Sequence, residues 1–268
     1  MAVCVSLALW LLALGGGVLG AGLAEETPDA EADSAARAES ESETTGTADA
    51  TSDEPLRIIF FGSSFTYYHD MPGTLQRLAS ATDPPFEVFE KIVAPPGYSL
   101  NLHWRDEQQR EHLAEPWDVM ILQEQAQAPL RQRERMREHA KLLVDKARAT
   151  TGDETRPRVI LFEVWAPKRR PQMIEILSNA YRDVAHTVGG EVAPVGRAWR
   201  RALEQRPSLQ LHSADGAHPG PLGSYLTACV FYTMITGEDP RGLPSFDLQA
   251  PADDIAFVQQ VAWEMVNP

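Results

Sequence analysis

Residues 56–66 read LRIIFFGSSFT, and this stretch decides the fold. Its first six residues, Leu56–Phe61, form a short apolar run rich in Ile and Phe, which is typical of a buried strand. Gly62 follows at once, and glycine adopts the backbone angles that a sharp turn requires. The order of strand, Gly-x-Ser and polar segment therefore places Ser64 at the carboxyl end of a strand, near the start of a helix.

Four more apolar runs follow the first, and segments of helical period separate them. The five expected strands cover residues 56–61, 86–93, 119–122, 159–164 and 191–195. Apolar residues recur at three- and four-residue steps over residues 72–81, 100–114, 129–149, 171–188, 197–206, 221–236 and 253–266. This alternation predicts an α/β fold: one domain over residues 56–268, built as a three-layer α/β/α sandwich around a five-stranded parallel sheet.

The first 24 residues have the pattern of a secretory signal peptide. Residues 5–23 carry no charge and consist mainly of Leu, Ala, Val and Gly, with small residues near a cleavage point. The alternative is an uncleaved membrane anchor, because a bilayer is spanned by roughly 20 apolar residues. The three glycines at 15–17 would weaken a spanning helix. We therefore expect a protein that is secreted, periplasmic or located in the cell envelope.

Residues 25–55 have the composition of a disordered acidic linker. They contain eleven Asp or Glu, one Arg and no Leu, Ile, Val, Phe, Trp, Tyr or Met, so no apolar burial offsets the entropy of ordering. This segment carries −10 of the formal net charge of −14, which leaves −4 for the domain. The acidity belongs mainly to the linker, and an acidic interaction arm is the alternative interpretation of this segment.

Cysteine and charge patterns exclude several classes of site and partner. Only Cys4 and Cys229 occur, and Cys4 lies in the expected signal, so the mature chain has no internal disulfide. Cys229 lies in an apolar run and is expected to be a buried small side chain. No basic patch is interleaved with aromatic residues, so we expect no nucleic-acid partner. No metal motif occurs, and we expect neither metal nor cofactor.

The segment 62–66, GSSFT, offers a candidate nucleophile. A serine at the start of a helix lies where the helix N-terminus stabilises negative charge. The alternative is an ordinary cap or turn, because serine is among the preferred helix caps. The motif does not decide between the two, since a serine hydroxyl also needs a base that removes its proton.

The segment 215–219, DGAHP, supplies that base in the loop before the helix expected at 221–236. His218 can face Ser64 while Asp215, three residues earlier, reaches the other ring nitrogen and fixes the tautomer. The alternative is a solvated turn with a capping Asp. Six other histidines lack this carboxylate spacing in a loop-then-helix context, and His212 is the nearest rival.

These two elements resemble the first and last blocks of the SGNH/GDSL hydrolase superfamily. GSSF stands in the place of the GDSL block, and DGAH matches the last block with its Asp-x-x-His. The sequence is similar to an uncharacterised, largely bacterial secreted branch whose first block reads GNSFT and whose third reads LQEQS; residues 122–126 here read LQEQA. The resemblance covers residues 56 to about 240 and implies a flavodoxin-like fold with Ser64, Asp215 and His218 as catalytic residues.

The resemblance also implies an oxyanion hole built from three donors. Two are the backbone N–H groups of Ser64 and of Gly97, which follows the second strand; an ordinary loop glycine is the alternative for Gly97. Most superfamily members have an Asn as the third donor, and this chain has none in that block. A glutamine amide can replace it. We favour Gln125, with Gln123 and Gln127 as alternatives, and Glu124 between them as a structural ion-pair partner.

The expected function is that of a monomeric secreted serine esterase that acts on a small-molecule or polysaccharide ester. O-acetyl groups on carbohydrate are the substrate that the resemblance suggests, and a membrane partner arises only if the signal stays uncleaved. Tyr98, Trp104 and Trp165 lie near the expected mouth, where they stack on sugars or, as we favour, pack in the domain. The alternatives are an O-acyltransferase with the same triad and a non-catalytic carbohydrate-binding domain of this fold.

Overall fold

The computed structural model describes residues 54–126, 128–151 and 156–268. The expected signal peptide, 1–24, lies outside these described residues, and so does the expected linker except for residues 54 and 55. The first strand that the structure describes begins at Leu56, the first residue of the expected strand.

A five-stranded, all-parallel sheet forms the centre of the domain, as predicted. The strands run in the order β2-β1-β3-β4-β5. Their bounds are β1 Leu56–Phe61, β2 Val88–Val93, β3 Val119–Leu122, β4 Arg158–Phe162 and β5 Glu191–Ala193. The side chains of Ile58, Ile59, Phe60 and Phe61 in β1 are completely buried, since helices cover this strand on both faces.

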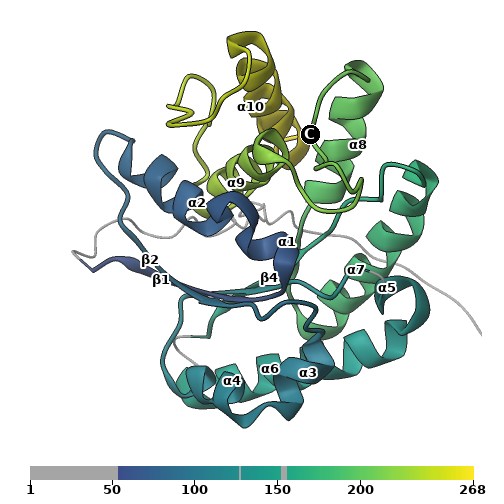
Figure 1. Cartoon of the computed structure of the whole chain (residues 1–268). Coiled ribbons are helices and arrows are strands. Elements are labelled where there is room, and N and C mark those ends of the chain that lie inside the picture. The colour runs from purple at the N-terminus through teal and green to yellow at the C-terminus, as the bar shows by residue number, and fades with distance from the viewer. Residues whose placement is uncertain (1–53, 127, 152–155) are drawn as a thin grey trace, which may run out of the picture. The chain divides into compact units, whose positions relative to one another are not determined.

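Helices cover both faces of the sheet, which confirms the three-layer α/β/α prediction. In Figure 1, α2, α9 and α10 lie on one side of the sheet, and α3, α4 and α6 lie on the other. The bounds are α2 Met71–Ser80, α3 Leu100–Arg105, α4 Glu107–Glu111, α6 Arg133–Thr151, α7 Ile174–Val188, α8 Val195–Gln205, α9 Pro221–Thr236 and α10 Ala252–Val266. Helix α9 is buried almost all round because it packs against α2, α8 and α10.

The helix expected over residues 100–114 is broken into three pieces. Asp106 has an extended conformation (φ −84°, ψ 111°), ends α3 and caps α4, with its Oδ1 accepting the N–H groups of Gln108 and Gln109. A 3₁₀ turn, His112–Ala114, completes the segment. The expected helix at 129–149 is likewise divided, into α5 (Ala128–Arg131) and α6. The spacing of apolar residues is the same before and after each break, so the sequence pattern did not predict where these helices are interrupted.

Two expected strands are shorter than predicted at their carboxyl ends. Strand β4 ends at Phe162, because the backbone carbonyl of Glu163 accepts the N–H of Gly196 and leaves the sheet. Strand β5 ends at Ala193, and Val195 already begins α8. Both ends thus turn toward helix α8 within the apolar runs that the sequence assigned to strands.

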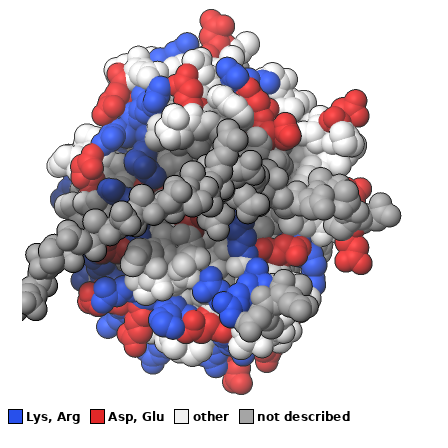
Figure 2. All heavy atoms as spheres, turned by 180° about the vertical axis from the view of Figure 1, so that it is seen from behind, with Lys and Arg blue, Asp and Glu red and all other residues white. Residues whose placement is uncertain are grey.

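Charged side chains of both signs lie on the described surface (Figure 2). On the face shown in Figure 2, basic and acidic side chains are interspersed, and neither sign forms a continuous patch. Among the described residues, no helix combines the length and hydropathy that crossing a bilayer requires. Cys229 is buried as expected, and burial raises the pKa of its thiol to about 12.

Candidate active site

The turn after β1 fits glycine and presents Ser64. A Cβ on Gly62 would lie 2.1 Å from the hydroxyl oxygen of Thr66, so a larger residue would displace the turn. Ser63 is extended, and the short helix α1 (Ser64–Tyr67) begins with the candidate nucleophile. Ser64 therefore lies at the carboxyl end of β1, at the edge where ligands bind in parallel sheets.

Gln123, the first residue after β3, stabilises this turn by hydrogen bonds from its side chain. Its side-chain Oε1 accepts hydrogen bonds from Ser63 N (2.8 Å), Ser63 Oγ (3.2 Å) and Thr66 Oγ1 (3.0 Å). Its amide nitrogen donates to the carbonyl oxygen of Glu124 at 2.5 Å, and the side chain is buried. The alternative of Gln123 as an oxyanion donor is therefore wrong, because its amide is used within the core. Gln127 lies outside the described residues.

The structure brings Ser64, His218 and Asp215 together. His218 Nε2 lies 3.0 Å from Ser64 Oγ, and His218 Nδ1 lies 2.5 Å from Asp215 Oδ2. A carboxylate accepts only, so Nδ1 donates to Asp215 and leaves Nε2 as the acceptor for the Ser64 hydroxyl. This is the hydrogen-bond order of a nucleophile, its general base and the group that orients the base.

Asp215 is held in its ionised form by four donors. His218 Nδ1 donates to Oδ2, and Oδ1 accepts from Ser213 Oγ, Ala217 N and His218 N at 2.8–2.9 Å. These hydrogen bonds, with that from His218 the largest, hold the pKa of the Asp215 carboxyl well below its usual range. The carboxylate is solvent-exposed for about half of its surface, so its orientation comes from these bonds and not from burial.

The loop that carries Asp215 and His218 is closed at its base. Ser213 N donates to His218 O at 2.8 Å, and Gly220 N donates to Leu211 O at 2.7 Å. Gly216 sits inside the loop at φ +70°, the left-handed region that favours glycine. The Asp-x-x-His spacing is therefore a shaped loop with little freedom at His218.

The segment after β4 donates two hydrogen bonds to the loop that carries Asp215 and His218. Lys168 N donates to Gly216 O at 2.9 Å, and Trp165 Nε1 donates to Ala217 O at 2.9 Å. Trp165 is stacked between Phe65 and Trp199, with ring centroids 4.4 and 4.0 Å away. Its side chain is buried, so of the two interpretations of Trp165 the packing one is confirmed.

Two residues that the sequence did not single out contact His218 or its neighbour Pro219. The ring of Tyr68 stacks on His218, and His69 Nε2 donates to Pro219 O at 3.1 Å. His69 has a left-handed backbone (φ 52°), which is uncommon for a residue other than glycine. Both lie just after α1, in the 3₁₀ turn Tyr68–Asp70. The aromatic residues that follow Ser64 in the sequence were the one pattern that could have indicated these contacts.

The remaining oxyanion candidates, Gly97 and Gln125, line one pocket of about 260 Å³. Gly97 is exposed at φ +73°, and within the described part of the chain neither its N–H nor that of Ser64 has a hydrogen-bond partner. Both N–H groups are thus available to an oxyanion. Ser64 itself does not line the pocket, so the convergence of the three donors stays a prediction.

Glu124, for which an ion pair was the alternative, is held by a backbone group instead. Its Oε1 accepts the N–H of Gln125 at 2.7 Å. The side chain is 2 % exposed, and burial raises the pKa of its carboxyl to about 7. Over the described residues this carboxylate has no ion-pair partner, so the ion-pair alternative for Glu124 is wrong.

His212, the rival histidine, lies away from the nucleophile. Its Nε2 donates to Ala166 O at 3.0 Å, and its ring packs edge-on against Trp199. A second, larger cavity of about 570 Å³ lies beside it between α7 and α8, with mainly apolar walls that include Trp165 and Leu203. Neither Ser64 nor His218 lines this cavity, so it is not the site of the candidate triad. Over the described residues, no group of three His, Cys, Asp or Glu side chains is arranged to hold a metal.

Comparison with solved structures finds SGNH-type hydrolases. A candidate SGNH hydrolase from Slackia heliotrinireducens is 22% identical, with a TM-score of 0.57, over 67% of this chain and 98% of its own. A DUF4886 family protein from Bacteroides uniformis is 18% identical, with a TM-score of 0.63, over 80% and 95%. The lipase/acylhydrolase from Enterococcus faecalis is 18% identical, with a TM-score of 0.54, over 73% and 100%.

Neither family models nor curated protein sequences match the chain. At these identities the solved structures show the fold: this chain has the α/β architecture of the SGNH/GDSL hydrolases, as the sequence blocks predict.

Proposed function

We propose that this chain is a serine hydrolase that cleaves carboxylic esters. The observation that carries the proposal is the hydrogen-bonded series Ser64–His218–Asp215, with distances of 3.0 and 2.5 Å. The SGNH/GDSL fold adds support, since the three residues occupy its first and last blocks. A non-catalytic binding domain has no need for a base held on one side by a carboxylate and on the other by a serine.

In the proposed mechanism His218 takes the proton of Ser64 as its Oγ attacks the ester carbonyl. The negative charge that develops on the carbonyl oxygen is stabilised by N–H groups of Ser64 and Gly97 and by the Gln125 amide. His218, now an imidazolium held by Asp215, gives its proton to the departing alcohol. Water then releases the acid from the acyl-enzyme by the same two proton transfers.

The proposed substrate is a short-chain ester, including O-acetyl groups on carbohydrate. The pocket beside Gly97 and Gln125 is small, about 260 Å³, and carries polar side chains of Ser99, Arg131 and Gln132 on its wall. Such a wall suits a short or polar acyl group better than a long alkyl chain. The uncharged apolar stretch at 5–23 supports a secreted protein.

Turnover of an aryl acetate tests the proposal, with three purified variants compared at equal folded concentration. Ser64→Ala and His218→Ala are expected to reduce kcat/KM by about 10³-fold or more. Ser63→Ala is the matched control and is expected to keep most of the activity, because among the described residues the Ser63 hydroxyl bonds only to Gln123. If both Ser64→Ala and His218→Ala kept their turnover, the assignment of Ser64 and His218 as catalytic residues would be wrong. An inactive but folded Ser63→Ala would move the nucleophile by one position.

A further inference from the structure

One pocket of the candidate site, of about 260 Å³, lies at the strand edge that carries Ser64. Its walls come from the segments after β2 and β3, the two neighbours of β1 in the sheet. Backbone hydrogen bonds join the ends of these strands: Gly62 N donates to Val93 O at 3.0 Å, and Gln123 N donates to Phe61 O at 2.8 Å. A group bound in this pocket therefore lies at the same edge of the sheet as the candidate nucleophile.

The side chains on this wall present hydrogen-bond donors. Ser99 Oγ accepts the N–H of Leu102 at 3.3 Å, so the Ser99 hydroxyl keeps its proton for another partner. Gln132 Oε1 accepts from Arg135 Nη1 at 3.1 Å, which leaves the Gln132 amide N–H₂ as a donor. Among the described residues that line the pocket, none is Asp or Glu. A wall of donors without a carboxylate suits a negatively charged group.

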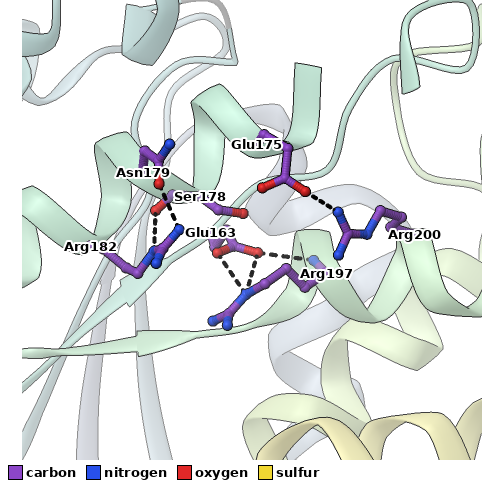
Figure 3. Close-up of polar contacts among 7 residues, drawn as sticks. All are labelled: Glu163, Glu175, Ser178, Asn179, Arg182, Arg197 and Arg200. Atoms are coloured by element: carbon purple, nitrogen blue, oxygen red, sulfur yellow. Dashed lines mark hydrogen bonds and ion pairs between the residues drawn. The ribbon is translucent and has the colours of Figure 1, made fainter. Parts of the chain in front are cut away.

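Arg131 lines the same pocket and adds a positive charge to it. This residue is exposed, and no carboxylate pairs with it in the described part of the chain. Figure 3 shows the contrasting arrangement on α8, where Arg197 lies against Glu163 and Arg200 against Glu175. Those two charges are neutralised within the domain, whereas the charge of Arg131 is available to a ligand.

We propose that the ester hydrolysed at Ser64 carries a carboxylate, and that Arg131 binds this carboxylate together with Ser99 and Gln132. The inference rests on the proposed function and adds the charge of the substrate to it. A guanidinium binds a carboxylate through two parallel N–H···O hydrogen bonds, which fixes the orientation of the substrate and selects its charge.

The position of the carboxylate within the substrate follows from the residues that share the pocket. Gly97 and Gln125 line it too, and in the proposed mechanism they serve the ester carbonyl. The carboxylate is therefore separated from that carbonyl by only a few atoms, in a pocket of about 260 Å³. It belongs either to the acyl group or to the alcohol, because both extend from the same carbonyl carbon, and paired esters distinguish the two.

Two pairs of esters test the proposal on the full chain. Monomethyl succinate and methyl succinamate have acyl groups of equal size, and only the first is charged; para-acetoxybenzoate and para-acetoxybenzamide differ in the same way on the alcohol side. We expect kcat/KM of the wild type for the charged ester to exceed that for its amide about 3- to 10-fold in one of the two pairs. That preference should fall as the ionic strength rises from about 0.01 M to about 1 M, because salt screens exposed charges. Ratios below about twofold in both pairs, or a ratio that salt leaves unchanged, overturn the proposal.

Substitutions of Arg131 separate its charge from its shape. Arg131→Gln is expected to bring the ratio of the two kcat/KM values to about one, mainly through KM of the charged ester, and Arg131→Glu to bring it below one. Arg131→Lys keeps the charge without the planar fork and should keep part of the preference.

Arg105→Gln is the matched control. Arg105 is also an exposed arginine without a carboxylate partner among the described residues, and it does not line the pocket. The ratio in this variant should equal that of the wild type. An unchanged ratio in Arg131→Gln, or an equal loss in Arg105→Gln, refutes the proposal.

A second arm does not depend on turnover. In the ¹⁵N-labelled Ser64→Ala chain, succinate is expected to shift the backbone amide resonances of Ser99 and Gln132, and succinamide to shift them little. The succinate shifts should be lost when Arg131→Gln is added. Equal shifts with both compounds, or shifts that persist without Arg131, overturn the anion site. Succinate binding by a protein that cleaves no ester instead refutes the proposed function and leaves the anion site intact.

Discussion

The phenol ring of Tyr68 lies flat on the imidazole of His218, with centroids 4.6 Å apart and planes inclined by 14°. An aromatic face attracts a cation, and His218 becomes one when it takes the Ser64 proton. Tyr68→Leu is therefore expected to reduce kcat/KM about 3- to 30-fold through kcat, which corresponds to about 0.5–2 kcal/mol. Tyr68→Phe keeps the ring and should stay within about twofold of the wild type. Equal losses in both variants would show that the hydroxyl, not the ring face, matters.

Asp215→Asn should inactivate the site without unfolding the domain. An Asn at this position can donate to His218 Nδ1, which favours the wrong tautomer, so we expect kcat to fall about 10³- to 10⁴-fold. The side chain is half exposed, and its loop keeps its two backbone closures, so the melting temperature should change little. Steady-state kinetics and thermal denaturation measure the two effects. Activity within tenfold of the wild type would exclude Asp215 as the group that orients His218.

The two glutamines after β3 are expected to separate stability from catalysis. Gln123→Ala leaves the N–H of Ser63 and the hydroxyl of Thr66 without their buried acceptor, so the free energy of unfolding should fall by about 2–4 kcal/mol. Gln125→Ala should change it by less than about 1 kcal/mol but lower kcat about 10²- to 10³-fold. Urea denaturation and aryl acetate kinetics on both variants provide the comparison. The reverse pattern would mean that the third donor has been misassigned.

His103 should make the stability of the domain depend on pH. Its Nε2 donates to Gly62 O, its Nδ1 is buried without a partner among the described residues, and burial lowers its pKa to about 4. A histidine whose pKa is lowered on folding contributes stability that is complete above about pH 6.5 and is lost as the pH falls to about 4. We expect the loss to be about 2–3 kcal/mol. His103→Phe keeps a ring in place and should remove this part of the pH dependence. An unchanged curve in that variant would contradict the assignment.

The sequence predicted those parts of the site whose geometry is local. Asp215 and His218 are three residues apart on one loop, so their spacing alone places the carboxylate at the base. Gly62 and the strand before it likewise determine the position of Ser64. Strands β1, β3 and β4 were found because burial on both faces makes each one a nearly continuous apolar run.

Features that depend on contacts between distant segments were not predicted. Gln123 was considered as an oxyanion donor, yet it bonds to the turn 60 residues earlier, and nothing in its own neighbourhood reveals that partner. Tyr68 reaches His218 only after α9 has packed against α2, which places the two loops together. The break at Asp106 depends on a choice between helix continuation and capping that apolar spacing does not encode.

Ser64 and His218 are separated by 154 residues in the chain, and the contact between them closes a loop that contains every strand from β2 to β5. Contacts between residues so far apart in sequence form late or slowly during folding, because loop-closure entropy opposes them. During refolding, the reactivity of Ser64 toward a fluorophosphonate should therefore return later than the far-ultraviolet circular dichroism of the helices. The chemistry of the nucleophile then reports when the last loop of the domain has docked.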